Sequence, residues 1–196
     1  MKNSILTLAL FLQAFILSAQ STTNNGTPTD QRLGFSIGYY GDRVSNQGYQ
    51  LGIEKYLATT NNYSVVGSML GSNYFVKNIS TAVSLNPRIG LRHTANSGIT
   101  LESHFGLGYL HRFYKYNDYS VNAQGQIVSS KKASQASVMP NFAFGLGYDF
   151  RKKANLPVVY FLRTSINYNY PNKHLFFEAS YALETGIVFI PKCKKK

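Results

Sequence analysis

Charged side chains recur at alternate positions along much of this chain, and they are the first candidates for chemistry. Glu102 and His104 are two residues apart, so in an extended strand both lie on one face. The same parity, followed through the chain, contains five acidic and five basic residues: Glu54, Arg88, Arg92, Glu102, Arg112, Asp149, Arg151, Arg163, Glu178 and Glu184. Carboxylates that face guanidinium groups could form an ion-paired structural network or a proton- or ligand-responsive pore lining. Because this set is neutral and an unpaired buried charge is costly, we favour the structural network, and we expect His104 to join it.

The sequence gives little support for a catalytic or metal-binding site. A nucleophilic serine needs a base within hydrogen-bond distance and a third group that orients the base. Residues 92–97 (RHTANS) are vaguely similar to the His-x-Ser-Asn motif of a lipid A deacylase family, but the serine spacing differs. His111 and His174 are isolated, so neither has the further ligands that a metal site requires. We therefore predict a non-enzymatic protein with no catalytic residue, no cofactor and no metal; a lipid A-modifying enzyme is the weakest alternative.

These side chains need strands to position them, and the sequence contains eight suitable runs. Phe142, Phe144, Leu146 and Tyr148, for example, alternate with small residues. The expected strands are 33–41, 47–57, 63–76, 79–92, 98–115, 134–151, 156–170 and 175–190. They predict an all-β fold, an eight-stranded antiparallel up-and-down transmembrane β-barrel over residues 33–190. The facing of the third strand stays open, because small residues occupy both of its parities.

Alternation alone does not say which parity faces outward, but side-chain size does. An eight-stranded barrel has an interior just wide enough for side chains to fill, so Phe, Tyr and Leu from every strand would overfill it. Charged residues make up 14% of the chain, against about 25% in ordinary soluble domains. Fifteen Tyr and thirteen Phe include many near the expected strand ends, as in interfacial aromatic girdles. These features favour a membrane barrel over a soluble, lipocalin-like one.

The ends of the chain indicate export. Residues 1–19 combine Lys2, an apolar run and a small-x-small ending, which is the pattern of a secretory signal peptide. Residues 20–32 read as a flexible leader and 191–196 as a basic periplasmic tail. The single Cys193 excludes an intramolecular disulfide. We expect an integral protein of the bacterial outer membrane after cleavage of the signal peptide.

One connection, residues 116–133, is long, and it is expected outside the cell, where barrels of this kind have their longer loops. Its composition suits adaptable contacts, so it is the candidate surface-interaction loop: Tyr116, Asn117, Tyr119, Asn122, Lys131 and Lys132. Asp42 and Arg43 are also placed in an outward connection. The chain carries a net charge of +12, but its basic residues gather at both ends of the barrel. That division argues against nucleic acid as a partner, and basic outer loops could attract lipid phosphates.

The runs 105–110 (FGLGYL) and 144–150 (FGLGYDF) resemble those of small outer-membrane β-barrel proteins of the Bacteroidota, which are porin-like relatives of the OmpA- and OmpX-like barrels. The final strand, with Glu184, Gly186 and Phe189, is similar to the insertion signal of such barrels, although Pro191 stands where a last aromatic is expected. The resemblance implies outer-membrane lipids and the barrel-assembly machinery as partners, and a monomer. We predict a structural or surface-interaction role with a filled lumen; the alternative is a narrow channel or a small-ligand-binding barrel.

Overall fold

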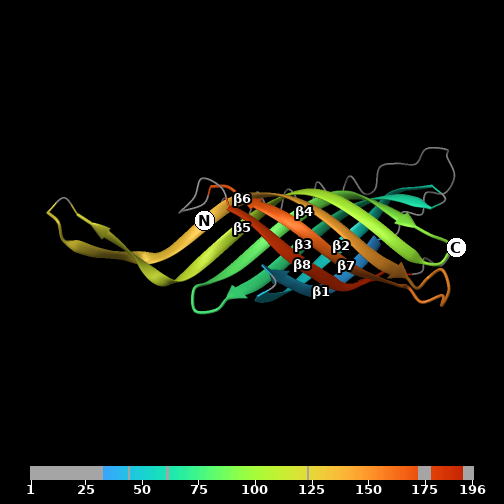
Figure 1. The fold of residues 1–196 in the computed structure, drawn as a ribbon, viewed down its shortest axis with the longest axis horizontal. Helices are drawn as coiled ribbons and strands as arrows, with labels where there is room; N and C mark the ends of the chain where they lie inside the picture. Colours follow the sequence, from blue (N-terminus) through green and yellow to red (C-terminus); the bar gives the residue numbers. More distant parts are fainter. Residues whose placement is uncertain (1–32, 44, 61, 123, 172–177, 192–196) are drawn as a thin grey trace.

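Eight antiparallel strands close into one barrel in a computed structural model that describes residues 33–43, 45–60, 62–122, 124–171 and 178–191 (Figure 1). The strands are β1 (Leu33–Asp42), β2 (Asn46–Thr60), β3 (Tyr63–Val76), β4 (Ser80–Thr94), β5 (Ile99–Val121), β6 (Ile127–Asp149), β7 (Val158–Asn169) and β8 (Glu178–Phe189). Each strand pairs with its neighbours in sequence, and β1 pairs with β8. The predicted fold is confirmed. The expected signal peptide (1–19), leader (20–32) and tail residues 192–196 lie outside the described residues.

The seam between the first and last strands depends on glycine. Gly38 of β1 lies directly opposite Gly186 of β8. A Cβ added to Gly38 would come 2.3 Å from the carbonyl oxygen of Thr185, and one added to Gly186 would come 2.3 Å from that of Ile37. Those distances are far below van der Waals contact, so a larger residue at either position would push the two strands apart.

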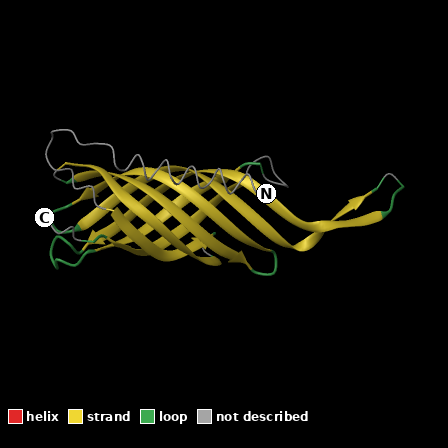
Figure 2. Ribbon diagram, turned by 180° about the vertical axis from the view of Figure 1, so that it is seen from behind, coloured by secondary structure: helices red, strands yellow, loops and turns green. Residues whose placement is uncertain are grey.

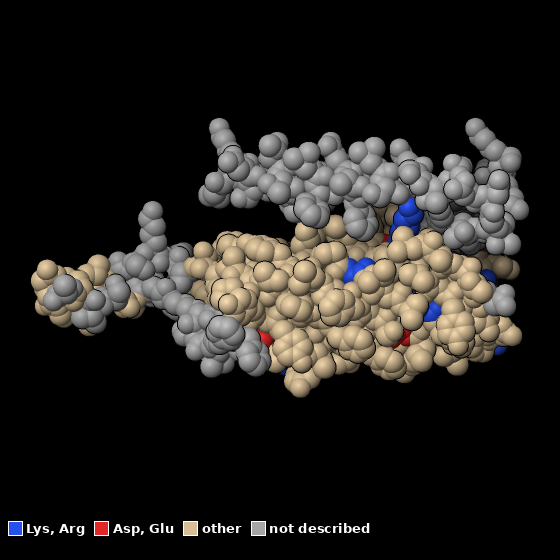
Figure 3. All heavy atoms as spheres, turned by 90° about the horizontal axis from the view of Figure 1, so that it is seen from above, with Lys and Arg blue, Asp and Glu red and all other residues tan. Residues whose placement is uncertain are grey.

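The outward face of the barrel is apolar, as the alternation predicts. Phe105 is 60% exposed and Leu107 58% exposed, and the space-filling view shows few charged atoms on the visible outer wall (Figure 3). The small and polar parity faces the interior. On β3, Ser64, Ser68 and Tyr74 are buried while Tyr63 and Phe75 are exposed, which answers the question that the sequence left open.

The segment expected to be a long outer loop is a β-hairpin for most of its length. β5 continues to Val121 and β6 begins at Ile127, and these two residues pair with each other. The hairpin extends well beyond the rim of the barrel (Figures 1 and 2). The loop prediction for 116–133 was therefore wrong: its turn is confined to residues 122–126, where Asn122 Oδ1 accepts hydrogen bonds from the backbone N–H groups of Gln124 and Gln126.

The two ends of the barrel differ. Leu33 and Phe189 lie at the end that carries the β2–β3, β4–β5 and β6–β7 connections. The protruding hairpin and the short β1–β2 and β3–β4 turns lie at the other end (Figure 1). No helix in the described part of the chain has the length and apolarity needed to cross a bilayer.

Candidate functional site

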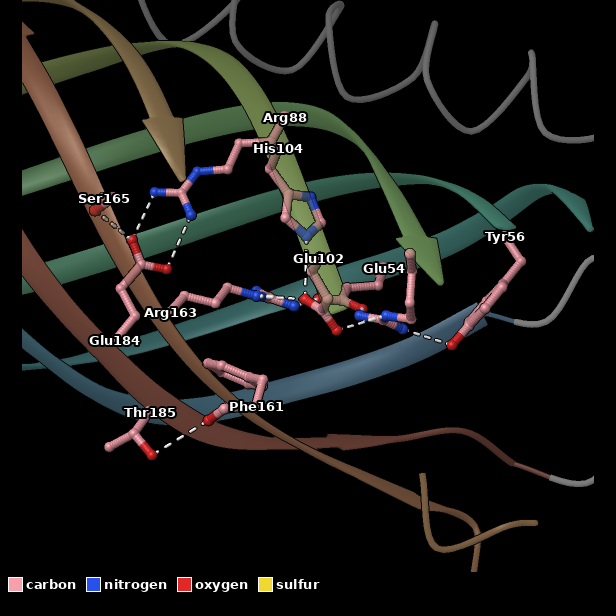
Figure 4. A network of polar contacts seen from close by, with 11 residues as sticks. Glu54, Tyr56, Arg88, Glu102, His104, Phe161, Arg163, Ser165, Glu184 and Thr185 are labelled. Carbon is pink, nitrogen blue, oxygen red and sulfur yellow. Dashed lines mark hydrogen bonds and ion pairs between the residues drawn. The ribbon is translucent and has the colours of Figure 1, made fainter. Parts of the chain in front are cut away.

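Four buried charges form a closed ring inside the barrel. Arg92 of β4 contacts Glu54 of β2 (Nη2–Oε2, 2.8 Å) and Glu102 of β5 (Nε–Oε1, 2.6 Å). Arg163 of β7 contacts the other oxygen of each carboxylate: Glu54 Oε1 at 2.8 Å through Nη2 and Glu102 Oε2 at 2.7 Å through Nε. All four side chains are at most 1% exposed. Each glutamate therefore bridges two arginines, and the charges within the ring balance (Figure 4).

A second ion pair lies beside the ring. Arg88 of β4 donates two hydrogen bonds to Glu184 of β8, Nη1 to Oε2 at 2.9 Å and Nη2 to Oε1 at 2.7 Å. Ser165 of β7 donates a third, from Oγ to Glu184 Oε1 at 2.9 Å. The fork of the guanidinium matches the two carboxylate oxygens, which is the strong form of this interaction. Strands β4 and β8 are not neighbours, so the pair crosses the interior (Figure 4).

A tyrosine contacts the ring on the side toward the barrel end that carries Leu33 and Phe189. Tyr56 of β2 accepts hydrogen bonds through its hydroxyl oxygen from Arg92 Nη1 at 2.5 Å and Arg151 Nη2 at 3.3 Å. Both guanidinium groups also lie over its ring, 5.5 Å and 5.4 Å from the centroid. Arg151 is in the turn after β6, where its Nε and Nη2 contact the two oxygens of Asp149 at 2.8 and 2.6 Å. Tyr56 therefore links this pair to the ring.

His104 contacts the oxygen of Glu102 that Arg92 does not contact. Its Nε2 lies 3.1 Å from Glu102 Oε2, and its side chain is fully buried. The ring of the histidine fits because Gly90 faces it from β4, where a Cβ would come 2.3 Å from Nδ1. His104 is thus packed into the network (Figure 4).

A separate cluster lies at the hairpin end of the barrel. Glu178 of β8 contacts Arg43, and its Oε2 is 3.3 Å from Arg112 Nη1. Asp42 is buried at the end of β1 and accepts a hydrogen bond from Asn46 Nδ2 at 3.1 Å. The expected place of Asp42 in an outward connection was wrong, because β1 runs one residue further than expected and puts Asp42 on the inward parity. Arg43 lies in the turn that follows, as expected, and its side chain is 51% exposed.

Two clusters of buried apolar side chains lie on either side of these charges. Ala182 precedes Glu184 on β8 and belongs to one cluster, whereas Val188 of β8 and Ile190, just after the strand, belong to the other. The cluster toward the hairpin contains Tyr40, Tyr74, Ala82, Leu110, Met139 and Ala182. The cluster toward the end with Leu33 and Phe189 contains Tyr56, Val66, Val159, Phe161, Val188 and Ile190.

Two residues that contact the buried arginines, Tyr56 and Phe161, are absent from the interior residues predicted from the sequence. The guanidinium carbon of Arg163 lies 4.2 Å from the centroid of the Phe161 ring. Tyr56 shares its strand parity with Glu54, and Phe161 shares its parity with Arg163. The parity rule could have found both, but a list restricted to charged groups and histidine left them out.

The candidate surface residues are only partly described. Tyr119 is 70% exposed on the hairpin, and Asn122 Nδ2 donates to Gln126 Oε1 at 3.2 Å across the turn. The side chains of Tyr116, Asn117, Lys131 and Lys132 fall outside the described part of the structure, although Asn117 and Lys132 pair through their backbones.

His93 and Ser97, from the run that is vaguely similar to the deacylase motif, have contacts with other residues. His93 packs against Tyr63, with ring centroids 4.7 Å apart. Ser97 Oγ accepts a long contact from the backbone N–H of Ile99 at 3.5 Å. Across the described ranges, no group of three His, Cys, Asp or Glu side chains could hold a metal ion.

Comparisons with known proteins show the fold. No protein-family model matches the chain, and no curated protein matches it in sequence. Ail, the attachment invasion locus protein of Yersinia pestis, superposes with a TM-score of 0.51 at 13% identity, over 82% of this chain and 98% of Ail. Neisserial surface protein A superposes with a TM-score of 0.50 at 11% identity, over 81% of this chain and 95% of that protein. The N-terminal β-barrel domain of Pseudomonas aeruginosa OprF has a TM-score of 0.48 at 14% identity, over 83% of this chain and 98% of that domain.

The class is therefore defined at the level of architecture. The chain is an all-β, closed, eight-stranded antiparallel barrel with the fold of small outer-membrane barrel proteins. At these identities the likeness extends to the fold alone.

Proposed function

We propose that this protein is a non-enzymatic, monomeric, integral outer-membrane barrel whose lumen is filled and ion-paired. Its role is structural or lies in surface contact through residues 116–133, and the long hairpin points out of the cell. The observation that carries the proposal is the reversed polarity of the barrel. Glu54, Arg163 and Glu184 are buried at 0–1% exposure, while Phe105 and Leu107 are more than half exposed on the wall.

Placement in a bilayer follows from that polarity. In water, an outer wall of Phe, Leu and Ile would be an aggregation surface, whereas in lipid it is the face that a barrel must present. Tyr49, Phe75 and Tyr109 lie outward near the hairpin end, and Tyr63 and Tyr160 near the other. These aromatic residues match the two interfacial girdles of membrane barrels.

The difference between the two ends supports the proposed orientation. Short connections at the end with Leu33 and Phe189 and a long extension at the other end are the pattern of outer-membrane barrels, with the extension outside the cell. Export by a signal peptide cleaved after Ala19 completes the proposal.

A structural role for the lumen rests on charge balance. The ring of Glu54, Arg92, Glu102 and Arg163 contains as many negative as positive groups, and each carboxylate oxygen has a guanidinium partner. Two apolar clusters lie on either side of the charges along the strands. Such an interior resists the passage of ions, since an ion entering it would have to displace paired charges or cross apolar packing.

A narrow channel is the second candidate, and one set of atoms favours it. Ser36 Oγ, Gln50 Nε2 and Ser68 Oγ, on the adjacent strands β1, β2 and β3, are buried without a hydrogen-bond partner. Buried polar atoms without a protein partner are commonly hydrogen-bonded to water, so this side of the lumen is suited to hydration. Single-channel recording in planar bilayers separates the two functions. A plugged lumen gives no steady conductance, and steady conductance from the pure protein would contradict it.

Membrane fractionation with a heat-modifiable gel shift tests the proposal as a whole. We expect the protein in the outer-membrane fraction, and we expect the unheated sample to migrate differently from the boiled one because the barrel survives in detergent. A protein that is soluble and does not shift would instead support a lipocalin-like barrel. Unchanged lipid A mass spectra in a deletion strain are expected for a protein that does not modify lipid A.

A further inference from the structure

Lys77 and Lys115 lie near each other at the hairpin end of the barrel. Lys77 lies in the three-residue turn between β3 and β4, where the backbone N–H of Ile79 donates a hydrogen bond to the carbonyl oxygen of Val76 (3.0 Å). The backbone N–H of Lys115 on β5 donates to the carbonyl oxygen of Ile79 (2.8 Å). Both lysine side chains are exposed. The β3–β4 turn and the neighbouring strand β5 thus place two exposed lysines in one part of the rim.

Directly below these lysines is an outward-facing apolar surface. Phe75 on β3 pairs with Thr81 on β4, which pairs with Phe113 on β5. Phe75 is 51% exposed and Phe113 50% exposed. The three side chains form a row across neighbouring strands. Phe75 and Phe113 lie two residues along their strands from Lys77 and Lys115, toward the middle of the barrel.

The aromatic side of this surface is held in place by its own contacts. The ring centroids of His111 and Phe113 are 4.4 Å apart, and the hydroxyl of Tyr109 lies 2.9 Å from His111 Nδ1. All three residues lie along the outward face of β5. An aromatic column below a basic rim matches the boundary between lipid tails and head groups.

Among the described side chains, neither lysine has an acidic partner. Of the acidic side chains described at this end, Asp42 contacts Asn46, and Glu178 contacts Arg43 and Arg112. Lys77 and Lys115 therefore leave two positive charges available for an anion from outside the protein.

We propose that Lys77 and Lys115, above the row Phe75–Thr81–Phe113, bind a phosphate group of lipid A in the outer leaflet of the membrane. This inference rests on the proposed function, because it needs the hairpin end of the barrel to face outward. In that orientation the two ammonium groups lie at head-group depth, where a phosphorylated glycolipid presents its phosphates. The acyl chains below pack on Phe75 and Phe113. An inner-leaflet phospholipid would lie at the opposite end of the barrel.

The test compares two doubly neutralised variants with the same change in charge. Lys77→Gln/Lys115→Gln removes the proposed site, and Lys152→Gln/Lys153→Gln removes two exposed lysines from the β6–β7 connection at the other end. The protein, exchanged into detergent, is titrated with diphosphoryl lipid A, and binding is followed by native mass spectrometry. Because exposed ion pairs are individually weak, we expect the loss of two of them to weaken binding of the first variant about tenfold, or about 1.4 kcal/mol, and the second variant to bind like the wild type.

Three results would overturn the inference: equal affinity of the first variant and the wild type, an equal loss in both variants, or binding of phosphatidylglycerol as tight as that of lipid A. The heat-modifiable shift is recorded for every sample. Its absence from the wild type would refute the proposed function, whereas a shifted protein with any of those results refutes the lipid A site alone.

Discussion

Arg163 on β7 reaches across the barrel to Glu54 on β2, with its Nη2 2.8 Å from Oε1, although these two strands do not pair with each other. The same guanidinium holds Glu102 on β5 through Nε at 2.7 Å. Hydrogen bonds between strands run around the wall, but this side chain ties distant parts of the wall together through the interior.

Loss of Arg163 is expected to destabilise the barrel strongly. Arg163→Leu leaves Glu54 and Glu102 sharing Arg92 alone, so buried negative charge is uncompensated, at a cost of about 3–5 kcal/mol. Urea unfolding in lipid vesicles measures this free energy. The control, Lys152→Ala, alters an exposed residue and is expected to change stability by no more than about 0.5 kcal/mol. An Arg163→Leu protein as stable as that control would contradict the ring as a source of stability.

The pair Arg88–Glu184 is expected to be strongly coupled. Arg88→Met or Glu184→Leu alone leaves a buried charge without its partner, whereas the double variant removes both charges. A double-mutant cycle by urea unfolding should therefore show the double variant losing less than the sum of the singles, with a coupling of about 2 kcal/mol. Simple additivity would mean that the two groups act independently despite their two hydrogen bonds.

A charge on the outer wall distinguishes lipid from water around the barrel. Leu107 lies midway along the wall part of β5 and is 58% exposed, and Tyr119 on the hairpin is 70% exposed. Leu107→Arg is expected to cost about 2–4 kcal/mol in a bilayer, as arginine does at the midplane of membrane barrels. Tyr119→Arg serves as the matched control and should be nearly neutral. Equal effects of the two substitutions on unfolding in vesicles would argue that both residues face water.

The hairpin is expected to be dispensable for folding. β4 pairs with β5 only as far as Tyr114, and β7 pairs with β6 from Asn141, so residues 117–132 pair only with each other. Replacing 117–132 by an Asn-Gly turn, which favours a tight hairpin, should leave the heat-modifiable shift intact. A truncated protein that no longer gives the shifted band would show that the hairpin takes part in barrel formation.

Alternation predicted the eight strands because one face of each strand is uniformly apolar, and it placed Glu54 and Arg163 on the same side of the wall. It left β3 open because Gly67 and Ser68 are both small, and only pairing with β2 and β4 decides their facing. It missed the hairpin because residues 116–133 are mostly polar and do not alternate regularly, as expected of strands that pack against no core. Partners such as Arg163 and Glu54 depend on the curvature and stagger of the closed barrel, which no local pattern contains.

The ties across the lumen also bear on the order of assembly. Glu54, Arg92 and Glu102 belong to the first five strands, while Arg163 and Glu184 arrive with the last two. A barrel that lacks β7 and β8 would hold an excess of carboxylate in its ring and a guanidinium without its carboxylate at Arg88. Both groups would have to stay hydrated until the chain is complete. Closure of β1 on β8 is therefore also the step that completes the charge balance of the interior, because the last two strands supply Arg163 and Glu184 to partners that are already in place.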